Sequence, residues 1–278
     1  NDFNDTPCPG LHPPKDPESL TPEQISGIVK AAGIVGMGGA TFPTHVKISS
    51  GLGKVDTVIL NASECEPYIT SDHRLVMEYP EAVVGGASIL ARVFGVDRIH
   101  VAIEDNKQNA AELLQLTIEK LKAPVVVDVL HTRYPQGAEK QLCQSITGRQ
   151  VPPGALPAAI GCAVFNTVTA AAIYQAVTTG KPVTHRIVTV SGSGVLEPKN
   201  LLCPLGTPIS DVLDAGGGVK KSTFKILMGG PMMGHAQYDM SAPIGKGTNA
   251  ILAFCEDEER TVDFPSCIRC GKCVSVCP

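Results

Sequence analysis

Residues 33–47 read GIVGMGGATFPTHVK, a glycine-rich stretch that follows a well-marked helix. Thr21 can cap that helix, Pro22 suits its first position, Gln24 completes a capping box, and Gly33 ends it. The stretch is not the dinucleotide fingerprint, because that motif follows a strand and opens a helix with the spacing G-x-G-x-x-G. By itself it indicates either a plain tight loop or a place where backbone N–H groups approach a phosphate or a flat ring.

Strand and helix patterns alternate along the chain after this loop. Apolar β-rich runs predict strands, and amphipathic runs predict helices. The predicted strands cover 55–60, 98–103 and 125–130, and the predicted helices cover 80–94, 106–121 and 170–177. Alternation of this kind indicates βαβ units and a mostly parallel sheet. The fold class is therefore α/β, with a first domain over residues 21–182 after an irregular lead-in at 1–20.

The sequence changes character near Lys181 and Pro182. The segment 183–254 holds short strand candidates at 185–191 and 224–228, many turn residues, and one helix that starts at Thr207-Pro208 and ends near 216. These features predict a separate small α+β domain.

Four cysteines lie close together at the end of the chain. The run Cys267-Ile-Arg-Cys270-Gly-Lys-Cys273-Val-Ser-Val-Cys277-Pro278 has the spacing C-x2-C-x2-C-x3-C-P. That spacing is typical of bacterial ferredoxins that bind [4Fe–4S] clusters, with a zinc site as the weaker alternative. In two-cluster ferredoxins the fourth cysteine binds the other cluster, so Cys277 is expected to serve a second cluster. Cys255 is an alternative fourth ligand, and residues 255–278 are interpreted as the truncated start of a ferredoxin-type domain.

Composition excludes several classes of protein. The net charge is −4 and no Lys/Arg run occurs, which argues against nucleic acid as a partner. No apolar stretch of about 18 residues occurs, so we expect no transmembrane segment. The chain starts at Asn1 rather than Met and stops at Pro278, and we interpret it as a fragment of a longer protein. Uneven cysteine spacing without a signal peptide favours a reducing compartment.

Four segments resemble the NADH-oxidising, FMN-binding flavoprotein subunit of respiratory complex I, and they occur in the order of that family. They carry glycines, an acidic loop and short polar motifs within residues 36–170. The segments are Gly36-x-Gly38-Gly39-Ala40-x-Phe42-Pro43-Thr44-x-x-Lys47, Asn61-Ala-Ser-Glu-Cys-Glu-Pro67, Tyr134-Pro-Gln-Gly137-Ala-Glu139 and Phe165-Asn-Thr-Val-Thr169.

The sequence resembles more closely the RnfC family, whose members belong to the membrane-bound Rnf electron transport complex. The stretches 33–47 and 61–74 read like that family almost throughout, and 186–235 resembles its β-grasp (SLBB-type) module. The resemblance implies a Rossmann-like flavin domain, a β-grasp domain, and a role in moving electrons between NAD(H), FMN and [4Fe–4S] clusters. It also implies an NADH-linked oxidoreductase that acts on ferredoxin indirectly. Such a protein would bind other Rnf subunits at the cytoplasmic face of the bacterial inner membrane, where ions are translocated.

The same resemblance implies roles for individual residues. Those expected to contact the isoalloxazine or ribityl part of FMN are Asn61, Ser63, Tyr134, Gly137 and Asn166. Lys47 would lie near the phosphate. The glycine-rich loop (Gly36, Gly38, Gly39, Ala40) and Glu64 would complete the cofactor site. Phe42, Glu66 and Glu139 would line the nicotinamide side.

Two departures from the complex I pattern keep other functions open. Ser63 stands where complex I has Asp, and Ala138 stands where it has Glu. One alternative is a cobalamin (corrin) reductase built on the same core. Another is an electron conduit or docking module without catalysis. Single residues also have structural alternatives: Phe42 as core packing, Lys47 as a surface lysine, Glu64 and Glu66 as a solvated loop.

Overall fold

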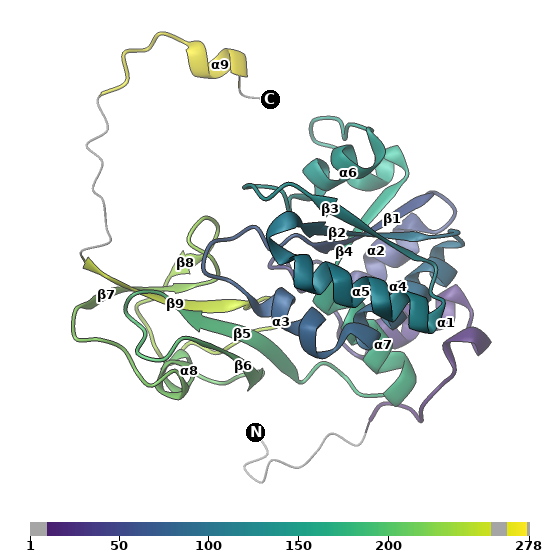
Figure 1. The fold of residues 1–278 in the computed structure, drawn as a ribbon, viewed down its shortest axis with the longest axis horizontal. Helices are drawn as coiled ribbons and strands as arrows, with labels where there is room; N and C mark the ends of the chain where they lie inside the picture. Colours follow the sequence, from purple (N-terminus) through teal and green to yellow (C-terminus); the bar gives the residue numbers. More distant parts are fainter. Residues whose placement is uncertain (1–9, 257–265, 277–278) are drawn as a thin grey trace.

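The computed structural model describes residues 10–256 and 266–276. Two bodies of different architecture follow one another along the chain (Figure 1). The first contains a four-stranded sheet and most of the helices, and the second contains a five-stranded sheet with one helix. None of the helices in these described ranges is both long and apolar enough to cross a membrane.

The sheet of the first domain has the strand order β3-β2-β1-β4, and its neighbouring strands pair in parallel. Its strands are β1 (Thr57–Ala62), β2 (Ile99–Glu104), β3 (Val125–Leu130) and β4 (Cys162–Asn166). The chain moves outward from β1 to β3 and then returns to place β4 on the other side of β1. The α/β class with a parallel sheet is confirmed.

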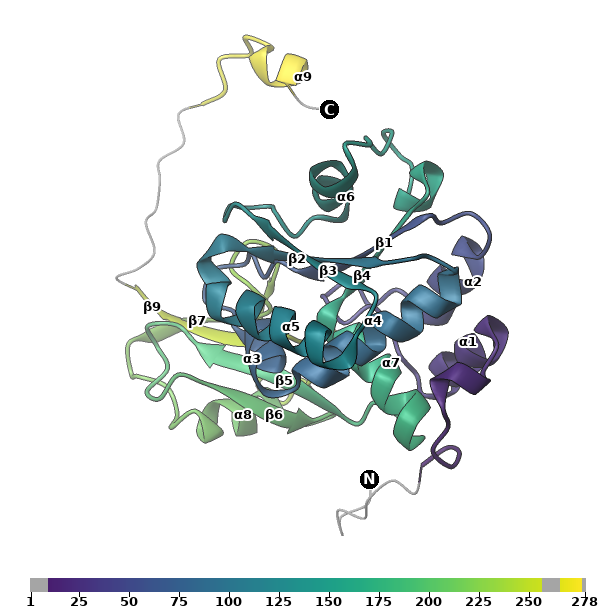
Figure 2. The same ribbon diagram turned by 45° about the vertical axis from the view of Figure 1, so that its right-hand side comes forward.

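Helices cover both faces of this sheet. The α-helices of the first domain are α1 (Pro22–Ala31), α2 (Thr44–Gly51), α3 (Ser71–Glu78), α4 (Pro80–Phe94), α5 (Gln108–Leu121), α6 (Glu139–Thr147) and α7 (Thr167–Thr179). Three short 3-10 turns lie at η1 (Pro17–Ser19), η2 (Asp105–Lys107) and η3 (Pro157–Ile160). Figure 2 shows α4, α5 and α7 on one face and α6 on the other.

Local signals account for where several of these elements begin and end. The capping box at Thr21 and Gln24 forms on α1, and Gly33 takes the left-handed conformation after it. The bounds of α4 and β3 match the prediction, while β1 begins two residues later than expected. The sequence patterns did not reveal α2, α3, α6 or β4, because these elements are short.

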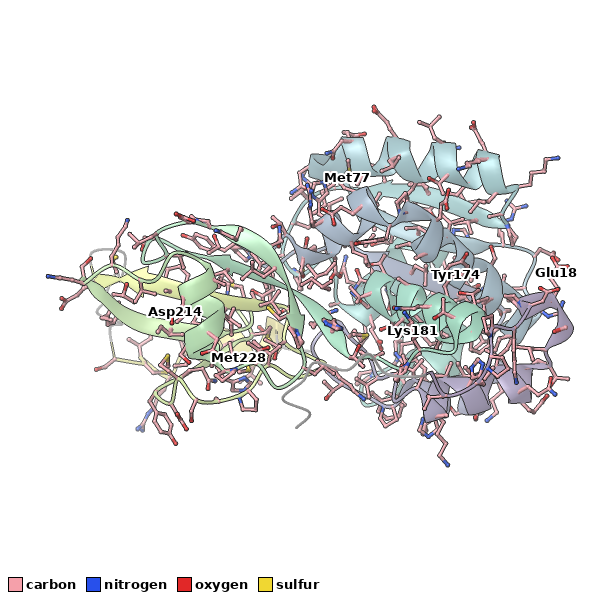
Figure 3. The ribbon with its side chains drawn as sticks, turned by 90° about the horizontal axis from the view of Figure 1, so that it is seen from below. Glu18, Met77, Tyr174, Lys181, Asp214 and Met228 are labelled. Atoms are coloured by element: carbon pink, nitrogen blue, oxygen red, sulfur yellow. The ribbon has the colours of Figure 1, made fainter. Side chains whose placement is uncertain are left out.

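The second domain is a mixed sheet of order β6-β5-β9-β7-β8. Its elements are β5 (His185–Ser191), β6 (Lys199–Pro204), α8 (Ile209–Ala215), β7 (Thr223–Met228), β8 (His235–Ala236) and β9 (Ala250–Cys255). Strands β5 and β9 pair in parallel and the other neighbours are antiparallel. Val188, Val190 and Ile251 form a separate small core with Ile209 and Val212. Figure 3 shows side chains filling both bodies, with Tyr174 in the first and Asp214 in the second.

Residues 266–276 include a short helix, α9 (Lys272–Val276). The cysteines of this segment that the structure describes, Cys267, Cys270 and Cys273, are exposed free thiols. The predicted ligand Cys277 lies outside the described residues. A ferredoxin-like domain is therefore not confirmed.

The packing of α4 against α7 generates a stability prediction. A Cβ atom at the buried Gly86 of α4 would overlap the backbone carbonyl of Ala170 in α7. Replacing Gly86 with Ala forces the two helices apart, and we expect the free energy of unfolding to fall by about 1–3 kcal/mol. Urea unfolding followed by circular dichroism measures this change.

Gly27 offers the matched control. It is exposed in the middle of α1, and an added Cβ there meets no atom within 4 Å. Gly27→Ala should instead stabilise the chain by roughly 0.5–1 kcal/mol, since alanine favours a helix more than glycine does. Equal stability of the Gly86→Ala variant and the wild type would contradict the close packing of α4 and α7.

Candidate functional site

A cavity of about 370 Å³ lies beside β4, the edge strand of the first sheet. The glycine-rich loop and α2 form one side of it, and residues 156–158 form another. One end of the cavity reaches the carboxyl ends of β1 and β4, where Asn61 and Asn166 are paired in register. Strand order reverses between these two strands, and open α/β sheets bind ligands at such a position.

Asn61 ties the end of β1 to the loop that precedes α6. Its side-chain amide donates to the carbonyl oxygen of Gly137 at 2.8 Å, and its oxygen accepts the N–H of Ser63 at 3.0 Å. A Cβ at Gly137 would come 2.5 Å from the carbonyl oxygen of Ser63, so only glycine fits there. The Asn61 and Gly137 positions therefore form one compact wall of the cavity.

Asn166 ends β4 and begins α7. Its side-chain oxygen caps the helix by accepting the N–H of Val168 at 2.9 Å, while its amide donates to the carboxylate of Asp72. The N-terminus of α7, which follows the lining residue Asn166, suits an anion.

Lys47 projects from α2 into the cavity. Its ammonium group donates to Glu139 at 2.6 Å and to the carbonyl oxygen of Val164 at 2.9 Å, and it lies 5.6 Å from the ring centre of Phe165. The Val164 carbonyl is accessible because β4 is an edge strand. Lys47 is thus held in place by the protein, and it lines the cavity together with Glu139, the carboxylate with which it forms an ion pair.

The glycine-rich loop folds back on itself. Gly36 donates to the carbonyl oxygen of Phe42 at 2.8 Å and accepts the N–H of Thr41 at 3.0 Å. The N–H of Met37 donates to the hydroxyl of Thr169 at 2.9 Å, which fixes the loop to α7. A Cβ at Gly38 would lie only 3.4 Å from the Cβ of Asn166. The loop backbone therefore forms a close-fitting side of the cavity.

The acidic loop after β1 lies behind this site. The hydroxyl of Ser63 donates to the carbonyl oxygen of Ala102 at 3.2 Å, so it points toward the sheet. Glu64 accepts the backbone N–H of Asp72 at 2.8 Å and of His73 at 3.2 Å, at the start of α3. Burial, together with the nearby charge of Asp72, raises the pKa of Glu64 to about 7.

Glu66 connects the acidic loop to the second domain. Its carboxylate accepts the N–H of Met232 at 3.0 Å, from the turn between β7 and β8. Its other oxygen is buried and has no partner among the described residues. Phe42 and Tyr134 are both substantially exposed, and the Tyr134 ring remains accessible near the Glu66 loop.

The structure brings most of the residues predicted from the sequence to the cavity wall. Those lining it are Gly36, Gly38, Ala40, Phe42, Lys47, Asn61, Gly137, Glu139 and Asn166. Those not among the lining residues are Gly39, Ser63, Glu64, Glu66 and Tyr134. Thr44 and Thr169 belong to the quoted segments but were given no role, and both line the cavity, as does Pro157, which none of those segments includes. Thr169 could have been found from its place one helical turn after Asn166, whereas Pro157 carries no such signal.

The cavity fits a flavin mononucleotide by size and by chemistry. Binding cavities for small ligands typically measure roughly 300–1,000 Å³ and are mostly apolar with a few placed polar groups. Val164, Phe165 and Ala163 supply apolar surface for a flat ring. Lys47 and the start of α7 supply positive charge for a phosphate.

The cysteine segment fits a metal cluster less completely. Within residues 10–256 and 266–276, no three His, Cys, Asp or Glu side chains gather closely enough to hold a metal ion. The loop does turn sharply, since Arg269 and Gly271 have positive φ and the N–H of Arg269 donates to the sulfur of Cys267 at 3.4 Å. Cys255 is buried at the end of β9 and accepts the hydroxyl of Ser222 at 3.2 Å, which leaves it poorly placed as a cluster ligand.

The raised pKa of Glu64 predicts a pH-dependent stability. Glu64 titrates near 4.5 when unfolded and at about 7 when folded, so between these values the folded chain binds more protons. The free energy of unfolding must then fall as pH rises through this window. Glu64→Gln lacks this titrating group, so its free energy of unfolding should fall less with rising pH. The variant should therefore become more stable relative to the wild type between about pH 5 and about pH 8.

Urea titrations at a series of pH values measure that difference. Glu112→Gln, at an exposed position of α5, is the control and should follow the wild-type pH profile. Parallel profiles for the wild type and Glu64→Gln would show that Glu64 does not titrate in this window.

Comparison with solved structures supports the architecture. A chain of the NAD+-reducing [NiFe]-hydrogenase in the H2-reduced state superposes with a TM-score of 0.74 at 23% identity, over 88% of this chain and 49% of that one. The air-oxidised form gives a TM-score of 0.72 at 22% identity, over 85% of this chain and 47% of that one. At this level of identity the likeness concerns the fold alone.

Curated relatives are much more similar in sequence, and each is named as the C component of an oxidoreductase complex. The protein from the proton-translocating ferredoxin:NAD+ oxidoreductase complex of Clostridium ljungdahlii is 45% identical over 97% of this chain and 59% of its own length. The protein from the Na+-translocating complex of Acetobacterium woodii is 43% identical over 100% of this chain and 63% of its own. The protein from the ion-translocating oxidoreductase complex of Rhodobacter capsulatus is 44% identical over 97% and 52%. The chain thus spans less than two thirds of each of these relatives.

Two family models match the chain, and they match its two bodies in turn. The model described as the Nuo51 FMN-binding domain matches residues 29–175, and the SLBB domain model matches residues 187–236. The first match covers more than half of the chain and includes all four strands of the parallel sheet. The chain therefore belongs to the Nuo51 FMN-binding domain family, with an SLBB domain following.

Proposed function

We propose that this chain is the FMN-carrying core of an RnfC-type component of an ion-translocating ferredoxin:NAD+ oxidoreductase complex. In this role it moves electrons between NAD(H), FMN and [4Fe–4S] clusters. The observation that carries the proposal is the cavity at the strand-order reversal, which combines a glycine wall, the Asn61–Asn166 pair and the ammonium of Lys47. The names of the relatives support the same function.

Within the cavity, each part of FMN has a suitable partner. Lys47 and the N-terminus of α7 would neutralise the phosphate, and charge-assisted hydrogen bonds of this kind are stronger than neutral ones. The backbone of the glycine-rich loop and the Asn61–Gly137 wall would hold the ribityl chain and one edge of the ring. Phe165 and Ala163 would shield the ring from water.

NADH would enter from the open side of the cavity. Phe42 is 47% exposed at this side and offers a ring on which a nicotinamide can stack. Glu139, from the cavity wall, and Glu66, from the acidic loop behind it, would line the nicotinamide side. When bound, FMN would supply the conversion between the two-electron transfer of a hydride and the transfer of single electrons.

The cysteine run would hold the electron acceptor. Cys267, Cys270 and Cys273 are the proposed ligands of one [4Fe–4S] cluster, and Cys277 is the proposed ligand of another. Contacts with the membrane would be made through partner subunits, with this chain at the cytoplasmic face. Ferredoxin would be reached only indirectly through those partners.

Anaerobic reconstitution with FMN, followed by addition of NADH, tests the proposal. We expect FMN to bind in an equimolar amount and its visible absorbance band to bleach with NADH. Lys47→Ala should weaken FMN binding about ten- to a hundredfold, because it removes a charge-assisted hydrogen bond of roughly 1.5–3 kcal/mol. Lys54→Ala, at an exposed site just after α2, is the matched control and should bind FMN normally.

The possible outcomes separate the candidate functions. Bound FMN that does not respond to NADH would point to another electron donor, and reduction of a corrinoid would then favour the corrin reductase. Failure to bind any FMN would contradict the flavoprotein function and favour the alternative of a docking module without catalysis.

Reconstitution with iron and sulfide tests the cluster ligands separately. Cys270→Ser should lower the bound iron and sulfide by removing one of three thiolates in the loop. Cys255→Ser should keep the wild-type content, since Cys255 is buried at the end of β9. Iron content that drops in Cys255→Ser and persists in Cys270→Ser would reverse this assignment.

A further inference from the structure

Arg186 is a fully buried cation at the junction of the two domains. It belongs to β5, the first strand of the second domain, and is only 1% exposed. Its Nε donates to the carbonyl oxygen of Thr248 at 3.1 Å in the second domain. Its Nη2 donates to the carbonyl oxygen of Met37 at 2.6 Å in the glycine-rich loop of the first domain. Its Nη1 is buried without a hydrogen-bond partner among the described residues. A buried guanidinium is costly unless it is paired, so an incompletely paired one at this position indicates a specific role.

Asp72, in the first turn of α3, is the carboxylate whose charge acts most strongly on Arg186, although no hydrogen bond or ion pair joins these two described side chains. Asp72 is buried, and burial raises the pKa of its carboxyl while the charge of Arg186 opposes that rise. Burial lowers the pKa of Arg186 in turn, and the carboxylates of Asp72 and, to a lesser extent, Glu64 counteract it. Arg186 and Asp72 therefore influence each other electrostatically across the domain junction without being in direct contact.

Asp72 and Met37 are both hydrogen-bonded to residues that line the cavity. The Asp72 carboxylate accepts the side-chain amide of Asn166, which lines the cavity and caps α7. Met37 accepts a hydrogen bond from Arg186 with its carbonyl oxygen, and its N–H donates to the hydroxyl of Thr169, another lining residue. Gly38, which follows Met37, lies next to Asn166, and a Cβ atom added to Gly38 would be in van der Waals contact with that side chain. Arg186 thus contacts the glycine-rich loop directly at Met37, and its charge acts on Asp72 of the Asp72–Asn166 pair.

We propose that Arg186 is a positioning residue for the flavin cavity, acting through Met37 and Asp72, so that the second domain is part of the flavin site. The inference rests on the proposed function, because it assigns the cavity to FMN. Without Arg186, the carbonyl of Met37 loses its donor, and the buried Asp72 loses the positive charge that acts on it most strongly, while Asn166 and Ser71 still donate to it. The loop and the Asn166 amide would then lose their fixed relative positions.

Fluorescence titration of the full chain with FMN tests this inference. Arg186→Met should weaken FMN binding at least about tenfold, the equivalent of one lost hydrogen bond to a charged group. Arg186→Lys keeps the charge but not the forked geometry, so a smaller loss of about three- to tenfold is expected. Arg98→Met, at an exposed position before β2, is the control and should bind FMN as the wild type does.

A double substitution separates positioning from a general loss of stability. If Arg186 acts by compensating Asp72, then Asp72→Asn added to Arg186→Met removes the uncompensated charge. The combined loss of FMN affinity should therefore be clearly smaller than the product of the two single losses. Circular dichroism and thermal melting check that each variant folds, and Arg186→Lys carries the test if Arg186→Met does not fold.

Three results would overturn the inference. The first is wild-type FMN affinity in Arg186→Met or in folded Arg186→Lys. The second is single losses that simply multiply in the double variant. Each of these leaves the flavin function itself intact, since the wild-type chain still binds FMN. The third, an absence of FMN binding by the wild-type chain, would overturn the inference together with the proposed function.

Discussion

The in-register pairing of β1 with β4 is the constraint on which the candidate site depends. It places Asn61 and Asn166 side by side at the carboxyl ends of two strands that are about a hundred residues apart in sequence. The reversal of strand order at this point leaves room above the sheet, and β4 remains an edge strand whose Val164 carbonyl can accept Lys47. The cavity, its polar wall and its cation all follow from this one pairing.

Polar contacts connect the two domains beside an apolar contact, in which Tyr68 and Ile69 of the first domain pack against Phe254 and Leu252 of the second. Arg186 reaches Met37, Glu66 accepts from Met232, and Lys246 donates to the carbonyl oxygen of Gly33 at 2.5 Å. Each of these contacts ends on the glycine-rich loop or on the acidic loop, which flank the cavity. Directional hydrogen bonds fix geometry more specifically than apolar contact does, because they fail when displaced by a fraction of an ångström. The second domain is therefore well placed to influence the shape of the site.

Much of the first domain could be predicted from local patterns. Helix α4 has an apolar face over fifteen residues, and α1 carries a complete capping box, so both are strongly marked. Helices α3 and α6 are short and mostly polar, and β4 is a five-residue strand, so periodicity could not separate them from loops. Several site residues were identified through resemblance, since Lys47 or Asn61 taken alone has no distinguishing local pattern.

The sequence by itself determined the α/β class, the alternation of strands and helices, and the spacing of the cysteine run. It also determined the change near residue 182 from regular strand–helix alternation to short strands and turns. All of these depend on neighbours along the chain. Only the tertiary structure decided which residues share the cavity. It turned Ser63 toward the sheet, hydrogen-bonded the Glu64 carboxylate to the start of α3, and brought Arg186 to Met37 across 149 positions of sequence. Contacts of this kind depend on strand order and domain packing, which no local pattern encodes.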